Sequence, residues 1–173
     1  MDEKLRNLLA RNELLDLVNR YARALDRCDR AELRSLFFDD AQVEMISHVG
    51  LALDFVELTL AALREHAIVS SHLTSNSIFE IAGDRAIGES YLISWSATRG
   101  VGGPLPATHV GRYLDRFECR DGVWKFISRK VVIDLSLSGP VPDAVTAHLP
   151  DPDAHRHPLD AVYAEKAWLE ASL

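Results

Sequence analysis

Two long strands joined by a tight turn are predicted by residues Thr108–Leu137, THVGRYLDRFECRDGVWKFISRKVVIDLSL. Aromatic and β-branched residues dominate this stretch, as is typical of strands. Asp121-Gly122 interrupts it and suits a type I′ turn, whose two residues need positive φ and whose twist matches that of paired strands. We therefore predict an antiparallel hairpin of Thr108–Arg120 and Val123–Leu137.

The residues before this hairpin continue the same pattern. Val69–Ala82 and Ala86–Arg99 are also rich in residues that favour strands. Gly83-Asp84 separates these two segments, and Gly100–Pro106 separates the second one from the hairpin. The sequence therefore predicts four long antiparallel strands in succession.

The N-terminal part has helical spacing instead. Apolar residues recur every three or four positions from Asp2 to Cys28, which predicts one long amphipathic helix. Asp29 can cap a second helix because Glu32 follows at the spacing of a capping box. The further predicted elements are a short helix, Arg30–Phe37, ended by Asp39-Asp40, a strand, Gln42–Ile46, and a helix, Asp54–His66. Helices followed by a run of strands favour an α+β fold over alternating βαβ units.

The chain is predicted to form a pocket domain over residues 1–138 and a tail over residues 139–173. Gly139–Pro158 holds five of the seven prolines and predicts an irregular surface segment. Leu159–Ala171 again has helical spacing and predicts a final helix. We expect this helix to dock on the domain or on a neighbouring subunit, and the alternative is a lid over the pocket.

Composition excludes several classes of partner. The chain has 19 Lys and Arg against 26 Asp and Glu, a net charge of -7, and no basic run, so nucleic acid is not an expected partner. No signal sequence or membrane-spanning stretch is present, so we expect a cytoplasmic protein without membrane contact. Cys28 and Cys119 lie far apart and indicate neither a disulfide framework nor a cysteine metal site.

No metal or cofactor is expected. His155 and His157 lie in the proline-rich tail, too isolated for a convincing metal site. The sequence contains no Gly-x-Gly-x-x-Gly motif, phosphate loop or Gly-x-Ser-x-Gly elbow, which argues against nucleotide cofactors and a hydrolase serine.

Asp26 and His72 are the first candidates for chemistry. Asp26 ends the first predicted helix at the edge of its apolar stripe, where it either faces solvent or lies partly buried beside a partner. His72 lies near the start of a predicted strand, on the same face as Ser70, Thr74 and Ile78. A histidine held by a carboxylate is a natural general base, although a histidine alone is more often structural.

Two further polar side chains are candidates for the same site. Tyr21 precedes Asp26 by about one and a half helical turns and either donates to a substrate oxygen or packs in the core. His109 stands early in the third long strand and could face the cavity from the opposite wall.

Three stretches together resemble the SnoaL-like branch of the nuclear transport factor 2-like superfamily. They are residues 12–43, NELLDLVNRYARALDRCDRAELRSLFFDDAQV, residues 71–81, SHLTSNSIFEI, and residues 111–129, GRYLDRFECRDGVWKFISR. Within this branch the chain is similar to scytalone dehydratase, bile acid 7α-dehydratase and hexachlorocyclohexane dehydrochlorinase. The resemblance covers residues from about 10 to 137.

The resemblance implies a cone-shaped α+β barrel, in which a curved, mostly antiparallel sheet holds the long first helix and the short helices in its concavity. It also implies a catalytic pair at Asp26 and His72, with Tyr21 at the place of the dehydratases' helix tyrosine. Ser94 and Ile133 stand where the bile acid enzyme has further polar residues, so its substrate is not carried over. The expected binding wall comprises His109 and the apolar residues Phe37, Phe38, Met45, Phe55, Leu58, Trp95 and Tyr113.

The resemblance, together with these residues, implies a cofactor-independent lyase, a dehydratase or related eliminating enzyme, acting on a hydrophobic molecule that we expect to be aromatic or polycyclic. Formaldehyde release from an aromatic diol and isomerisation are alternatives that would use the same pair. A third alternative is a non-catalytic binding or structural subunit, such as the small subunit of an aromatic-ring dioxygenase.

The outer face of the sheet is expected to be partly apolar, with Ile81, Ile87, Leu114 and Val132 among its residues. The superfamily usually hides this face between subunits. We therefore expect a homo-oligomer, a trimer or a dimer.

Overall fold

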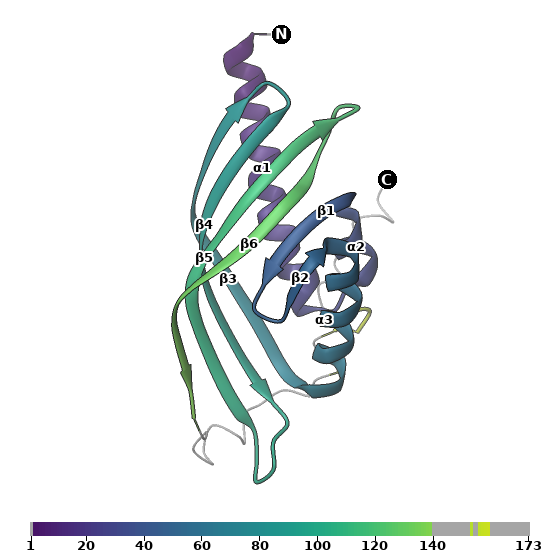
Figure 1. The fold of residues 1–173 in the computed structure, drawn as a ribbon, viewed down its shortest axis with the longest axis vertical. Coiled ribbons are helices and arrows are strands. Elements are labelled where there is room, and N and C mark those ends of the chain that lie inside the picture. Colours follow the sequence, from purple (N-terminus) through teal and green to yellow (C-terminus); the bar gives the residue numbers. More distant parts are fainter. Residues whose placement is uncertain (1, 140–152, 154–155, 160–173) are drawn as a thin grey trace.

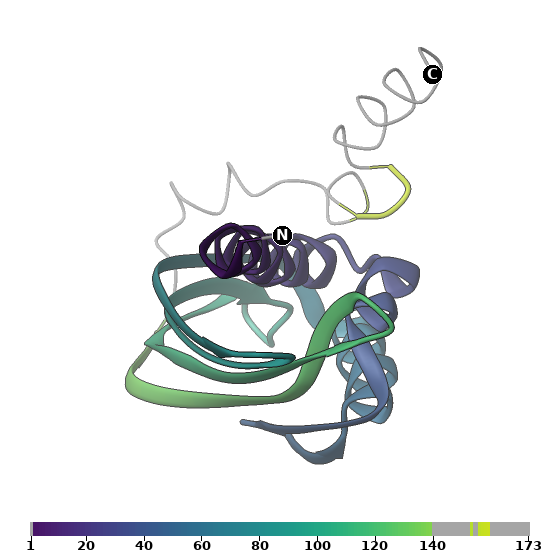
Figure 2. The ribbon, with the colours of Figure 1, turned by 90° about the horizontal axis from the view of Figure 1, so that it is seen from above.

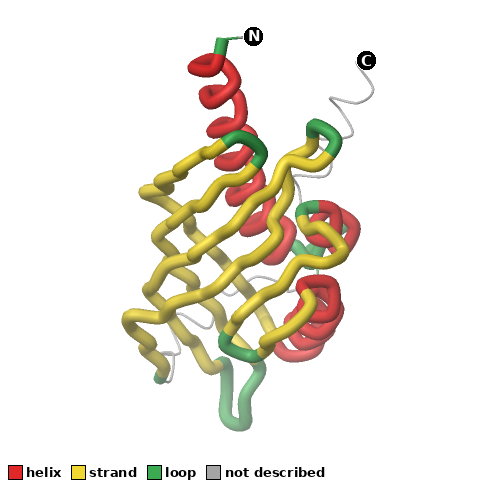
Figure 3. The backbone as a smooth tube through the Cα atoms, turned by 45° about the horizontal axis from the view of Figure 1, so that its top comes forward, coloured by secondary structure: helices red, strands yellow, loops and turns green. Residues whose placement is uncertain are grey.

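The computed structural model describes residues 2–139, 153 and 156–159. Within them, three helices lie beside one curved layer of six strands (Figures 1 and 3). The elements are α1 (Glu3–Asp26), α2 (Arg30–Ser35), β1 (Phe37–Met45), β2 (His48–Leu51), α3 (Ala52–His66), β3 (Ala67–Ala82), β4 (Arg85–Thr98), β5 (Leu105–Arg120) and β6 (Val123–Ser138). The predicted final helix lies outside the described residues, apart from Leu159.

The sheet has the order β2-β1-β6-β5-β4-β3. All neighbouring strands run antiparallel except β1 and β6, which are parallel. Seen from above, the sheet forms a trough, and α1 lies along its inner face while α2 and α3 stand beside β1 (Figure 2). The predicted α+β architecture of a long first helix held by a curved, mostly antiparallel sheet is confirmed.

The turn that joins β5 and β6 also forms as predicted. Asp121 has φ 53° and Gly122 has φ 80°, the left-handed pair that a type I′ turn requires. From this turn, Arg120 pairs with Val123 and Phe117 with Phe126. Beyond Phe117 the register shifts by one residue, so the strands continue with a bulge between them.

The end of α1 is fixed by its own backbone. Cys28 has φ 51°, its N–H donates to Leu25, and the N–H of Asp29 donates to Ala24, which together form a Schellman motif. Asp29 then caps α2, as predicted, by accepting from the N–H of Glu32 at 3.1 Å. The chain therefore turns sharply after Asp26, which becomes the last residue of α1.

Several predicted boundaries were wrong, chiefly around β1. This strand begins at Phe37 rather than Gln42, and Phe37 pairs with Phe126 of β6. Asp40 does not break the strand, and its carboxylate accepts two hydrogen bonds of 2.8 and 3.0 Å from Arg120. The short strand β2 was not predicted, since four residues with an exposed Val49 carry little signal. Smaller differences are α2 ending at Ser35 and α3, β3 and β5 beginning at Ala52, Ala67 and Leu105.

A bulge in β3 changes which side chains face inward. Asn76 has φ 48°, and the pairing with β4 shifts between Ser75 and Ile78. Ile78, expected on the face of His72, is therefore 63% exposed on the outer face, and Phe79 is buried. Ile81, expected on the outer face, packs against the core for the same reason.

Candidate active site

The end of α1 and the start of β3 meet at Asp26. Its carboxylate accepts three hydrogen bonds: Oδ2 from the backbone N–H of His72 at 2.8 Å, and Oδ1 from Ser70 Oγ at 3.2 Å and His72 Nδ1 at 2.5 Å. The side chain of Asp26 is only 6% exposed and that of His72 is 15% exposed. The pair is therefore largely shielded from solvent, and both carboxylate oxygens are occupied.

The arrangement follows from local geometry. Ser70 and His72 are two residues apart in β3, so their side chains point to the same face of the sheet. Asp26 approaches that face because α1 ends there. An ionised carboxylate only accepts hydrogen bonds, so Nδ1 of His72 carries the proton and Nε2 is left as the acceptor nitrogen of the ring.

His72 borders a cavity of about 190 Å³ between the sheet, α1 and α3. Most of its lining is apolar, with histidine, tyrosine and small hydroxyl side chains at separate points. The lining comprises Tyr21, Leu25, Met45, Ile46, Ser47, Phe55, Thr59, Leu63, Ser70, His72, Leu92, Ser94, Trp95, Ser96, His109, Tyr113, Val131 and Ile133.

Behind Tyr21 and Tyr113 lies a buried ion pair that was not predicted. Arg129 and Asp115 are both fully buried and form two hydrogen bonds of 2.7 Å. The guanidinium carbon lies 4.0 Å from the ring centre of Tyr21, 4.3 Å from that of Tyr113 and 4.2 Å from that of Phe126. Nη1 of Arg129 is buried without a hydrogen-bond partner among the described residues.

One signal for this pair was present in the sequence. Asp115 alternates with Tyr113 and Phe117 in the predicted strand, so a charge falls on an otherwise apolar face. If the pairing set by the turn continued without a shift, however, Ser128 would lie opposite Asp115. The bulge beyond Phe117 shifts the pairing by one residue and so places Arg129 opposite Asp115.

Burial raises the pKa of both phenols. It raises the pKa of Tyr21 to about 12, although the neighbouring Arg129 opposes the shift. Burial also raises the pKa of Tyr113 well above its ordinary value. Both side chains are neutral hydrogen-bond donors at physiological pH, as ordinary tyrosines are, and they stay neutral to a higher pH.

His109 lies on the opposite wall. It pairs with Ser94 across β4 and β5, so both side chains share the inner face. Nδ1 of His109 lies 2.7 Å from Oγ of Ser136 on β6. The cavity thus has a second imidazole, held by a hydroxyl rather than by a carboxylate.

Two residues expected in the wall do not line the cavity. Leu58 is 60% exposed, because the buried face of α3 runs through Phe55, Val56 and Leu60. Phe38 packs under Arg120, with the guanidinium carbon 4.2 Å from its ring centre. Trp95, also expected in the wall, borders the cavity.

The other apolar residues expected in the wall lie at the cavity or directly behind it. Met45, Phe55 and Tyr113 line the cavity. Phe37 lies in the second layer, edge-on to the ring of Tyr21.

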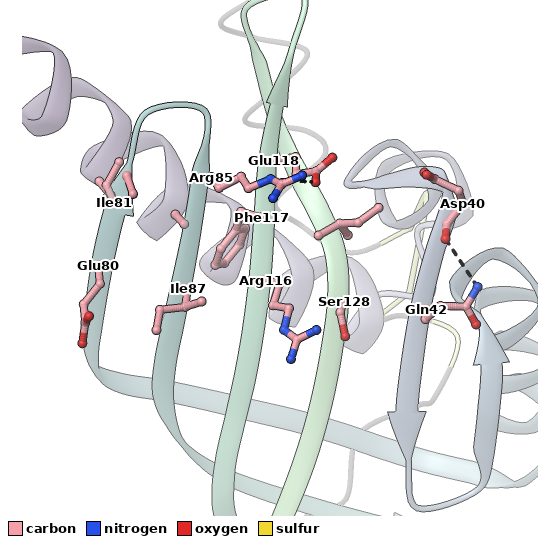
Figure 4. A pocket seen from close by; sticks show the side chains of 13 residues that line it. Asp40, Gln42, Glu80, Ile81, Arg85, Ile87, Arg116, Phe117, Glu118 and Ser128 are labelled. Atoms are coloured by element: carbon pink, nitrogen blue, oxygen red, sulfur yellow. Dashed lines mark hydrogen bonds and ion pairs between the residues drawn. The ribbon is translucent and has the colours of Figure 1, made fainter.

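Among the described residues, three other hollows are larger than this cavity. Two of them, of about 730 and 930 Å³, lie on the outer face of the sheet and contain neither Asp26 nor His72. Figure 4 shows the first, with Glu80, Ile87, Arg116 and Ser128 on neighbouring strands. The third, of about 490 Å³, lies on the other side of Asp26 and His72, between α1 and β3. All three are open, so their size alone does not make them the candidate active site.

Among the described residues, no three His, Cys, Asp or Glu side chains lie together as metal ligands. No helix in this part of the chain has the length and apolar character needed to cross a membrane.

Comparison with known proteins identifies the fold of the chain. Solved structures that it resembles include a type 2 hexachlorocyclohexane dehydrochlorinase (TM-score 0.70, 22% identity, 82% of this chain and 99% of that one). A type 3 dehydrochlorinase from Novosphingobium barchaimii has a TM-score of 0.69 at 22% identity, over 81% and 99%. A candidate scytalone dehydratase from Novosphingobium aromaticivorans has a TM-score of 0.69 at 22% identity, over 79% and 91%. No curated protein sequence matches.

Sequence identities of 22% show a shared fold but not a shared activity. At the level of sequence, residues 6–130 match the SnoaL-like domain. The chain therefore belongs to the SnoaL-like domain family, and its fold is that of the nuclear transport factor 2-like proteins.

Proposed function

We propose that this protein is a cofactor-independent lyase that eliminates water or a similar leaving group from a small hydrophobic ring compound. The observation that carries the proposal is the hydrogen-bonded pair of Asp26 and His72 at the wall of a mostly apolar cavity. A buried carboxylate that orients an imidazole makes the other ring nitrogen a general base.

In this mechanism, Nε2 of His72 takes a proton from a substrate carbon next to the one that bears the leaving group. The electron pair of the broken C–H bond forms the new double bond, and the leaving group departs with its own bonding electrons. Asp26 stays ionised and stabilises the imidazolium that forms. Tyr21 donates a hydrogen bond to the departing oxygen, since its phenol is protonated at physiological pH.

The size of the cavity limits the substrate. An apolar cavity of about 150 Å³ accommodates benzene, so about 190 Å³ suits one ring with small substituents rather than a polycyclic molecule. His109 and Ser94 place polar atoms on the wall across from Tyr21. The favoured substrate is therefore a monocyclic compound with oxygen substituents at two positions.

The leaving group could also be a halide or formaldehyde, and isomerisation would need the same base. The non-catalytic alternative is less well supported. A purely structural subunit has no need of a buried carboxylate and an imidazole that share a hydrogen bond beside an open cavity.

The test is turnover of a panel of monocyclic β-hydroxy ketones and halogenated rings, followed by the absorbance of the new double bond. We expect His72→Ala to lower kcat/KM on any substrate found by about 10²- to 10⁴-fold, because the general base is lost. Asp26→Asn should lower it as well, since an amide can donate to Nδ1 and so favour the wrong tautomer.

His66→Ala is the matched control, because His66 is exposed and lies 3.8 Å from its nearest carboxylate, that of Glu65. It should leave turnover unchanged. Undiminished turnover in His72→Ala would refute the proposed role of the pair.

A further inference from the structure

Arg156 is buried in the domain although it comes from the C-terminal part of the chain. It is 7% exposed. Its Nη2 donates to the carbonyl oxygens of Leu63 at 2.8 Å and Ala67 at 2.6 Å, and its Nη1 donates to that of Arg64 at 3.4 Å. One guanidinium thus binds three backbone carbonyls from the end of α3 and the start of β3.

These carbonyls lie at a place where a cation is favoured. The last four carbonyl groups of a helix have no partners within it, and the partial negative charge of the helix is concentrated there. In addition, α3 passes into β3 without a loop, since His66 ends the helix and Ala67 begins the strand. Binding at this junction therefore fixes the first residues of the strand β3, which leads to Ser70 and His72.

The same segment also reaches the end of α1. The N–H of His157 donates to the carbonyl oxygen of Arg27 at 2.6 Å, one residue beyond Asp26. Arg156 itself borders a small hollow together with Asp26, Cys28 and Ser70. Two consecutive residues of the C-terminal segment therefore join the two elements that carry the candidate pair.

We propose that Arg156 is a positioning residue: with the backbone of His157, it holds the end of α1 against the start of β3, and so keeps Asp26 and His72 at hydrogen-bonding distance. This inference rests on the proposed function, because it assigns the C-terminal segment a part in building that site. The pocket domain alone would then lack part of what aligns its acid and base.

Arg99 provides a matched control. It also caps α3, since its Nη1 donates to Glu65 and Ala67 and its backbone N–H donates to His66. No hydrogen bond among the described residues links Arg99 to α1. Loss of either arginine should destabilise the end of α3, but only loss of Arg156 should loosen the link to Asp26.

The experiment observes the Nδ1 proton of His72 by nuclear magnetic resonance in the full chain, with Asp26→Asn to assign the signal. We expect Arg156→Ala to speed exchange of this proton with water about tenfold or more, or to abolish the signal, since several hydrogen bonds to a charged group are lost. Arg99→Ala should keep the exchange rate of the wild type even where its melting temperature falls as far.

Arg156→Lys covers the case in which the alanine variant does not fold. A lysine ammonium is a single point of donation and cannot span the three carbonyls, so its exchange rate should also exceed that of the wild type. A wild-type rate in the folded Arg156 variants, or an equal acceleration in Arg99→Ala, would overturn the proposal.

The readout needs no substrate, so the two proposals can fail separately. Faster exchange in Arg156→Ala, combined with full turnover in His72→Ala, would refute the proposed function and leave the positioning role of Arg156 intact. The opposite pair of results would refute the role of Arg156 alone.

Discussion

At the scale of single residues, the inner wall behind the cavity combines aromatic rings with one buried charge pair. The ring of Tyr21 packs edge-on against those of Phe37, Tyr113 and Phe126, at centroid distances of 5.8 to 6.1 Å. Arg129 lies over three of these rings, which is favourable for a desolvated cation. The phenols are thus held in place from behind, and burial raises their pKa.

The raised pKa of Tyr21 predicts a loss of stability in alkali. Its pKa is about 12 in the folded protein and ordinarily 10.0, so the stability that the neutral phenol contributes is complete below pH 10 and is lost as the pH rises to about 12. Over this range the free energy of unfolding should fall by about 2–3 kcal/mol more in the wild type than in Tyr21→Phe. Urea denaturation at several pH values measures the difference, and parallel curves would contradict the prediction.

The buried ion pair predicts a strongly non-additive pair of substitutions. Arg129→Leu should lower the free energy of unfolding by about 3–5 kcal/mol, because it leaves the buried carboxyl of Asp115 without its partner. The double variant Asp115→Leu/Arg129→Leu should recover much of this loss, since no unpaired polar group stays buried. Urea denaturation of the wild type and both variants measures the differences, and a double variant no more stable than Arg129→Leu would contradict the prediction.

At the scale of elements, β3 carries the site because of its bulge. Before Asn76, residues at even positions face inward, among them Ser70 and His72, whereas after it Phe79 and Ile81 do. The strand can therefore present a polar face to the cavity at one end and an apolar face to α1 at the other. A strand without a bulge would expose one of these sets.

The positive φ of Asn76 predicts opposite effects for two substitutions. Asn76→Gly should preserve stability or raise it by up to about 1 kcal/mol, because glycine adopts φ 48° freely. Asn76→Val should lower stability by about 1–3 kcal/mol, because a β-branched residue is strained there. Thermal denaturation of both variants tests the bulge, and a valine variant as stable as the glycine variant would argue against it.

At the scale of the whole molecule, the outer face of the sheet exposes many large apolar side chains. It presents Leu73, Ile78, Ile87, Tyr91, Ile93, Leu114 and Leu135, each at least 36% exposed. Glu80, Ile87 and Arg116 form one transverse row over β3, β4 and β5 (Figure 4). Neither the side chain of Glu80 nor that of Arg116 has a hydrogen bond or ion pair with any described residue, so two opposite charges without partners lie on either side of the apolar Ile87.

This arrangement favours a second copy of the chain as the partner that covers the outer face of the sheet. Under twofold symmetry, Glu80 of each copy can face Arg116 of the other while the apolar residues pack between them. We expect light scattering after size exclusion to show an oligomer, and Ile87→Asp to shift it to the monomer mass. Val123→Asp, at the tip of the β5–β6 hairpin, is the control and should leave the mass unchanged. A wild-type monomer would contradict this prediction.

The sequence by itself determined what depends on neighbouring residues. Periodicity and turn chemistry predicted the long first helix, the Asp29 cap, four long strands and the turn at Asp121-Gly122. The resemblance of three stretches then indicated the family, which the match over residues 6–130 confirms. These features could be predicted because propensity, capping and alternation act over a few residues.

Only the tertiary structure decided which residues meet. The bulge at Asn76 assigned Ile78 and Ile81 to faces opposite to those predicted, and the bulge beyond Phe117 placed Arg129 against Asp115. Likewise, pairing with β6 made a strand of a segment that begins before two aspartates, and the burial of Arg156 could not be anticipated from a proline-rich tail. A shift of one residue leaves the local pattern of a strand unchanged, yet it turns every later side chain to the other face of the sheet.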